Sequence, residues 1–135
     1  MTYSELITES LRMIGVLMYS ESADANQAAQ GISVLNDMMS DWEGDGIMLG
    51  YVPSVTPTDT LSMDPTAKSA VKANLAIKLC PFYERQPHPA ILEQATSGKG
   101  TLMRSVMLGN INPVTMRHVP RGTGRWFDIL TGLLR

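Results

Sequence analysis

The clearest structural signal in the chain lies in residues 25–46, which read ANQAAQGISVLNDMMSDWEGDG. Apolar residues recur there at intervals of three and four, which is the period of one helix face, and polar residues occupy the other face. Gly44 and Gly46 bracket Asp45 in a cluster that ends a helix. The stretch therefore predicts an amphipathic helix from about residue 25 to Glu43. Its expected buried face consists of Ala25, Ala28, Ile32, Leu35, Met39 and Trp42.

Upstream of this stretch, the sequence predicts a shorter helix over residues 3–14. Thr2 and Glu5 have the S/T-x-x-E spacing of a capping box, and apolar residues recur at helical intervals up to Gly15, a natural stop. An acidic connector follows, in which Ser22 can cap the next helix.

Downstream, residues 47–63 show a different pattern. Pro53 and Pro57 exclude a helix there, and the threonines and valines around them are typical of extended chain. We expect either an extended segment or a small β hairpin, inserted into an otherwise helical fold.

A third helix is predicted to begin at Asp64 and Pro65, because an N-cap followed by proline at the first helical position is a common start signal. Its apolar positions continue to Leu79, and Pro81 should kink or end it. The expected buried face consists of Ala67, Ala70, Val71, Leu75, Ala76 and Leu79.

A fourth helix is predicted after His88 and Pro89. Gly98 and Gly100 weaken its middle by about 1 kcal/mol each relative to alanine, so a break is allowed there. Its apolar residues are Ile91, Ala95, Leu102 and Val106, with Leu92, Met103 and Met107 beside them.

Residues 111–135 lack helical periodicity and contain frequent prolines and glycines, which predicts an extended C-terminal arm. The arm is nevertheless too apolar for a disordered linker. An extended apolar segment must be covered, and a partner surface is the simplest cover. The chain thus divides into a helical core, residues 1–110, and an arm, residues 111–135. The apolar residues of the arm are Trp126, Phe127, Ile129, Leu130, Leu133 and Leu134.

Length and composition narrow the function classes. The 135 residues fit one domain, and the single cysteine excludes an internal disulfide. No stretch is apolar enough to span a membrane, and no signal peptide is expected. The net charge is −2, but residues 1–64 hold ten acids and one base, whereas residues 99–135 hold six bases and one acid. This asymmetry predicts surfaces directed at different neighbours, or the arm of one subunit lying on another.

The RGTGR stretch, residues 121–125, has two interpretations. Its glycines and arginines could cradle a phosphate, but no strand–loop–helix pattern surrounds it. The favoured interpretation is an arm that turns closely against a protein, with Arg121 and Arg125 paired to acids there. Trp126 and Phe127 would then be its anchors, because aromatic residues dominate interface energies. A frayed terminus is the remaining alternative.

Metal binding and catalysis have little support. The spacing of the histidines and the cysteine matches no metal site, and no cofactor is expected. Two carboxylate pairs each share a helix face, which a cell-wall glycoside hydrolase would need, but a solvated face produces the same pattern. The residues concerned are His88, His118 and Cys80 for metal, and Glu5 with Glu9 and Asp37 with Asp41 for hydrolysis.

A small DNA-binding protein is a further function class to weigh. It needs a recognition helix with clustered basic residues. The second predicted helix is acidic, and the third offers only Lys68, Lys72 and Lys78.

Three segments taken together resemble the head-to-tail adaptor family of tailed phages, which includes the tail accessory, or packaged-DNA stabilisation, factors. They are SLRMIGVL at residues 10–17, LNDMMSDW at residues 35–42 followed by Gly44 and Gly46, and PRGTGR at residues 120–125. The resemblance spans most of the chain. It departs from the family at residues 53–59 and at Gly98 to Gly100, where a more continuous helix is expected.

The resemblance implies a non-enzymatic, mainly all-α protein: a four-helix bundle-like core with the extended or hairpin insertion and the C-terminal arm. It implies a ring, of twelve copies to match the portal protein, that extends the DNA channel, keeps packaged DNA in the head and docks a tail nozzle or tail terminator protein. Such a ring belongs to the virion neck and is assembled in the host cytoplasm. Double-stranded DNA would pass without specific binding, and no membrane is involved.

Two sets of site residues are expected under this hypothesis. The arm residues that bind the portal or a neighbouring copy are Pro120, Arg121, Gly122, Thr123, Gly124, Arg125, Trp126 and Phe127. Acids of the second helix and the turn after it would repel DNA phosphates if they faced the channel. These acids are Asp37, Asp41, Glu43 and Asp45.

Overall fold

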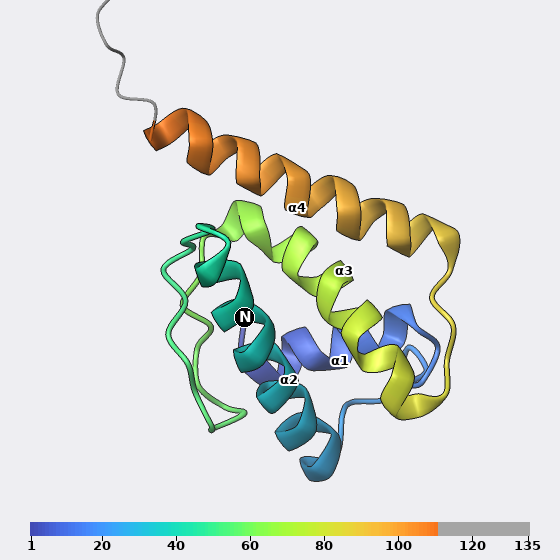
Figure 1. The fold of residues 1–135 in the computed structure, drawn as a ribbon. Coiled ribbons are helices and arrows are strands. Elements are labelled where there is room, and N and C mark those ends of the chain that lie inside the picture. Colours follow the sequence, from blue (N-terminus) through green and yellow to red (C-terminus); the bar gives the residue numbers. More distant parts are fainter. Residues whose placement is uncertain (111–135) are drawn as a thin grey trace, which may run out of the picture.

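The computed structural model describes residues 1–110, and they form a helical body without a β-strand (Figure 1). The expectation of a mainly all-α fold with four helices is confirmed. The helices are α1 (Tyr3–Met13), α2 (Ala25–Gly44), α3 (Lys68–Leu79) and α4 (Pro89–Asn110), with 3-10 turns η1 (Pro65–Ala67) and η2 (Cys80–Tyr83). The predicted C-terminal arm lies outside the described residues.

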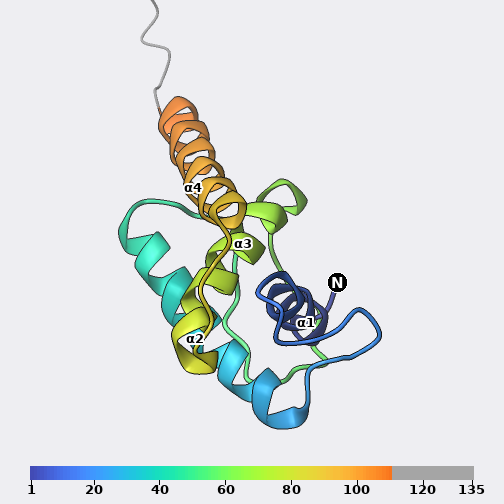
Figure 2. The ribbon, with the colours of Figure 1, turned by 90° about the vertical axis from the view of Figure 1, so that its right-hand side faces the viewer.

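The helix α3 is the centre of the body, and it contacts the other three helices (Figures 1 and 2). A helix surrounded in this way must be apolar on most of its circumference. The predicted buried face of α3 is confirmed at every position, and Ala73 is buried as well. Buried residues of α1 and α2 form one core cluster with those of α3. In Figure 1, α1 and α2 lie below α3, and α4 lies above it.

The caps of α1 and α2 show where local sequence sets the helix ends. In α1 the predicted capping box is confirmed: the Glu5 N–H donates to Thr2 Oγ1 at 3.2 Å, and the Thr2 N–H donates to Glu5 Oε2 at 2.7 Å. The prediction of Ser22 as the cap of α2 is wrong. Asp24 caps the helix instead, in a second capping box with Gln27, because the first helical residue is Ala25 and the cap must directly precede it.

The segment between α2 and η1 is extended, which is the first of the two alternatives that the sequence allowed. It pairs with the N-terminus rather than with itself. Thr60 forms an antiparallel bridge with Thr2, and the Ser4 N–H donates to the Pro57 carbonyl at 2.9 Å. Leu61 is buried beneath this contact. The segment therefore closes the open side of α1 and α2.

The start and end of α3 follow the predicted signals. Asp64 caps the turn η1 by accepting from the Thr66 N–H at 3.0 Å, and Pro65 occupies the first position. The helix ends at Leu79, and Pro81 lies in the turn η2.

The helix α4 is continuous, so the break allowed at Gly98 and Gly100 does not occur. A Cβ built on Gly98 would lie 2.7 Å from the Ala70 Cβ, whereas a Cβ on Gly100 meets no described atom within 4 Å. Gly98 therefore lets α4 approach α3 closely, and this packing compensates for the low helix propensity of glycine.

Candidate functional site

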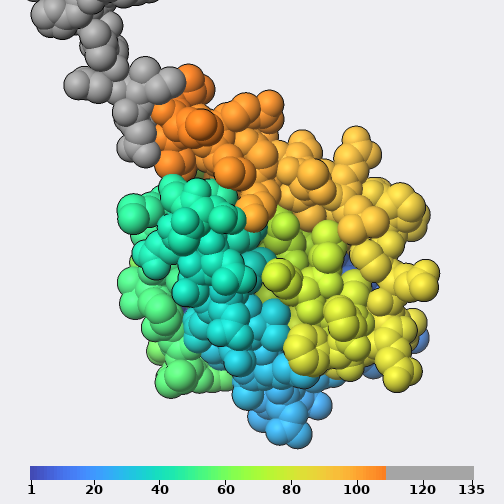
Figure 3. All heavy atoms as spheres, viewed as in Figure 1, coloured from blue at the N-terminus to red at the C-terminus, as the bar shows by residue number. Residues whose placement is uncertain are grey.

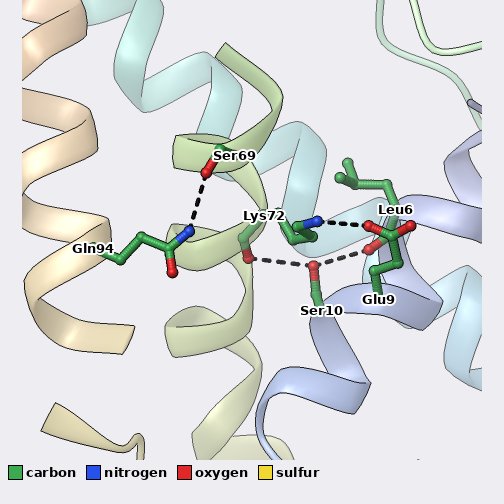
Figure 4. A network of polar contacts seen from close by, with 6 residues as sticks. All are labelled: Leu6, Glu9, Ser10, Ser69, Lys72 and Gln94. Atoms are coloured by element: carbon green, nitrogen blue, oxygen red, sulfur yellow. Dashed lines mark hydrogen bonds and ion pairs between the residues drawn. The ribbon is translucent and has the colours of Figure 1, made fainter. Parts of the chain in front are cut away.

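Polar contacts hold α3 to the helices on both sides of it (Figure 4). On the α1 side, Lys72 Nζ lies 2.7 Å from Glu9 Oε2. The buried Ser10 hydroxyl lies 2.9 Å from the Leu6 carbonyl oxygen and 3.3 Å from that of Lys72, and it shares its proton between them. These contacts hold α1 against α3.

On the α4 side, Asn74 Nδ2 donates to the carbonyls of Ala70 at 2.8 Å and Ala95 at 3.0 Å. Gln94 Nε2 donates to Ser69 Oγ at 3.0 Å (Figure 4). The first half of α4 is thereby fixed over α3. The second half has fewer partners and extends past α3 in both ribbon views (Figures 1 and 2).

This extension leaves most of the apolar face of α4 exposed. Among the apolar residues that the sequence placed on this helix, only Ala95 is fully buried, and Leu92, Met103 and Met107 are exposed, Met107 to 64%. The periodicity correctly identifies one face of the helix. The face remains exposed because α4 packs mainly on α3 and reaches beyond it, and only the end of α2 and the turn after it lie beside the last part of α4.

The four acids expected to act together occupy three different environments. Asp37 and Asp41 are exposed on one face of α2 and form no ion pair within residues 1–110. Glu43 is also exposed, and it lies at the rim of a hollow between α2 and the extended segment. Asp45 pairs with Lys99 Nζ at 3.1 Å, and the same ammonium lies 5.7 Å from the Trp42 ring centre. Asp45 therefore holds α4 to the end of α2.

Two apolar hollows flank Ile47, and together they are called the Ile47 groove here. One has a volume of about 320 Å³ and lies between α2 and the extended segment; its lining includes Met39, Glu43, Met48 and Pro53. The other, of about 250 Å³, lies between the end of α2 and α4; its lining includes Asp45, Met103, Val106 and Met107. In the space-filling view, the orange end of α4 lies beside the teal residues that follow α2 (Figure 3).

The candidate catalytic and metal-ligating residues are scattered or already engaged. Glu5 is held in the capping box of α1 and Glu9 by Lys72, so neither is poised as a free acid. His88 is exposed before α4, and its Nδ1 accepts from the Ala90 N–H. Cys80 is buried, and burial raises the pKa of its thiol. No cluster of three metal-ligating residues exists in the described part of the chain, and His118 lies outside it.

The lysines of the DNA-binding alternative lie on α3, the central helix. Lys72 pairs with Glu9, and only Lys78 is exposed. A recognition helix must present one face to the major groove. A helix packed against three others cannot do so, and this argues against the alternative.

Sequence reasoning located the acids but missed the groove beside them. Met48 and Pro53 lie in an extended segment without a helical period, so their shared surface with α2 is visible only in three dimensions. The arm residues Pro120 to Phe127 lie outside the described residues. No helix within residues 1–110 is both long and apolar enough to cross a membrane.

The described residues thus define a small helical protein with a buried, well-packed centre, an acidic helix face and an exposed apolar groove, features suited to contacts with other proteins. The chain belongs to the P22 tail accessory factor family, whose model matches residues 1–134. It therefore has a structural role related to the phage tail, and it is associated with structural proteins of the virion. This family of structural factors is not a known enzyme family.

Proposed function

We propose that the chain is a head-to-tail adaptor that binds the portal protein as a ring of twelve copies. The ring extends the DNA channel, keeps packaged DNA in the head and offers the surface on which the next tail protein, a nozzle or terminator, docks. It occupies the virion neck and is assembled in the host cytoplasm. The observation that carries the proposal is the family match, because it includes both the helical body and residues 111–134.

The arm, residues 111–135, is the proposed means of attachment. Residues 111–135 hold four arginines and one aspartate together with the two adjacent aromatics Trp126 and Phe127. Arginine and tryptophan are enriched among the residues that dominate interface energies. The arm binds the portal protein or a neighbouring copy through residues 120–127, and the helical body supplies the ring itself.

Asp37 and Asp41 are the proposed channel-facing acids. They are exposed, they lie one helical turn apart on α2, and no base within residues 1–110 neutralises them. A negative surface of this kind repels phosphates at distances up to about 10 Å at moderate salt, so DNA passes without being held. Asp45 is not part of this surface, because Lys99 neutralises it.

Deletion of residues 112–135 tests the role of the arm. The core cluster lies wholly within residues 3–80, so the truncated chain should keep its helical circular dichroism and its urea midpoint. We expect it to lose binding to the portal protein of the same phage, measured by co-sedimentation against the full-length chain. A truncated chain that still forms complete rings on the portal would refute the role of the arm.

A further inference from the structure

We propose that the Ile47 groove of one copy receives the stretch Arg125 to Leu134 of the next copy in the ring. The proposal rests on the adaptor function proposed above, and it names the surface that accepts one part of the arm. The remainder of the arm and the helical body are left for the portal.

The groove has the properties of a protein-docking surface. Its two hollows lie beside each other, and Ile47 lines both of them. Methionines line both hollows, and two of them are strongly exposed, Met48 to 73% and Met107 to 64%. Methionine side chains adapt to the shape of a partner, and exposed apolar patches on small proteins mark interaction sites.

The arm matches the groove in size and in charge. A hollow of about 320 Å³ lies at the low end of the range for binding pockets, which suits one or two large side chains such as Trp126 and Phe127. Glu43 lies at the rim and has no ion-pair partner within residues 1–110. Arg125 directly precedes the two aromatics and supplies the complementary charge.

The direction of α4 favours a neighbouring copy over the same copy. Met103, Val106 and Met107 near the end of the helix line the groove, and the helix extends past the body in both ribbon views, so this end of α4 is open to a neighbouring copy (Figures 1 and 2). The fifteen residues from 111 to 125 span at most about 50 Å when extended, which exceeds the length of α4, about 33 Å for its 22 residues. A head-to-tail contact of this kind closes into a ring when the rotation from copy to copy divides one full turn evenly, without a shift along the axis.

Disulfide trapping in the full-length chain tests the contact. One chain carries Met48→Cys and another carries Phe127→Cys; Cys80 is buried in both and needs no substitution. The two are mixed, with and without portal protein, oxidised, and resolved on a non-reducing gel. We expect a cross-linked dimer from the mixture. A mixture of Glu93→Cys with Phe127→Cys is the control and should give none, because Glu93 is exposed on α4 outside the groove.

A chain that carries both Met48→Cys and Phe127→Cys separates the two directions of binding. Ladders of linked copies support the proposal. A cross-linked monomer means that the arm binds its own groove, and it overturns the proposal, as does the absence of any cross-link. If the chain binds the portal but gives no cross-link, the groove contact is refuted and the adaptor function stands. If the copies cross-link but do not bind the portal, the groove contact stands and the adaptor function is refuted.

Charge reversal tests the ion pair within the contact. Glu43→Arg should lower the yield of cross-linked dimer about tenfold, and adding Arg125→Glu to the same chain should restore it, because each groove then meets the opposite charge again. Glu93→Arg is the matched control and should change nothing. An unchanged yield for Glu43→Arg, or no recovery in the double variant, would show that this pair does not form.

Discussion

The close approach of α3 and α4 at Gly98 makes a prediction that two neighbouring glycines can test against each other. Replacing Gly98 by alanine adds a Cβ that would lie 2.7 Å from the Ala70 Cβ and 3.1 Å from its Cα. Carbon atoms in contact lie about 3.5 to 4.0 Å apart, so α4 must move by about 1 Å or distort. Gly100→Ala adds the same methyl group where no described atom lies within 4 Å.

The magnitudes follow from this geometry. Overpacking of a helix contact costs about 1 to 3 kcal/mol, whereas alanine improves helix propensity by about 1 kcal/mol at either position. Gly100→Ala should therefore stabilise the protein by up to about 1 kcal/mol. Gly98→Ala should destabilise it by about 1 kcal/mol, because the overpacking exceeds the gain in propensity. The propensity term is common to both variants, so the difference between them measures the close approach.

Urea unfolding followed by helical circular dichroism gives both free energies. The double variant Gly98→Ala with Ala70→Gly restores the space, and it should be more stable than the sum of the two single changes. If Gly98→Ala is as stable as Gly100→Ala, the helices are not in close contact at this point. The position of α4, and with it the wall of the Ile47 groove, would then be wrong.

Two further predictions concern buried titratable groups. Burial raises the pKa of Tyr51, and the nearby Tyr3 raises it further, so the folded protein keeps a phenol proton that the unfolded chain loses near pH 10. The contribution of Tyr51 to the free energy of unfolding should therefore be constant below about pH 10 and fall above it, so Tyr51→Phe should reduce the fall that the native chain shows there; equal slopes for the two chains from pH 9 to 11 in urea titrations would contradict it. The thiol of Cys80, 3% exposed, should react with a thiol reagent only after urea opens the protein, and rapid labelling of the native chain would contradict its burial.

The elements of the fold could be predicted because their signals are local. Capping residues, helical spacing and prolines near helix ends act over a few residues, and they identified all four helices. The apolar faces of α1 and α3 were found for the same reason, since both lie in the middle of the body. Ala25 is exposed although it follows the spacing of α2, because it is the first residue of that helix and lies before the core.

The parts that could not be predicted depend on distant segments. The continuity of α4 depends on Ala70, which lies 28 positions before Gly98 and makes the glycine favourable there. The exposure of Met103 and Met107 depends on where α4 passes the end of α3, which no local period reveals. Glu43 and Asp45 are alike in sequence, and only the position of Lys99 gives them different roles.

The central claim, that the chain is an adaptor on the portal, is tested most directly by the mass of the full-length protein mixed with its cognate portal protein. Light scattering coupled to size exclusion would give the stoichiometry, and electron microscopy would show the rings. The account predicts a complex of fixed composition with twelve copies on one face of the portal ring. A chain that stays monomeric and elutes apart from the portal at all concentrations would contradict it.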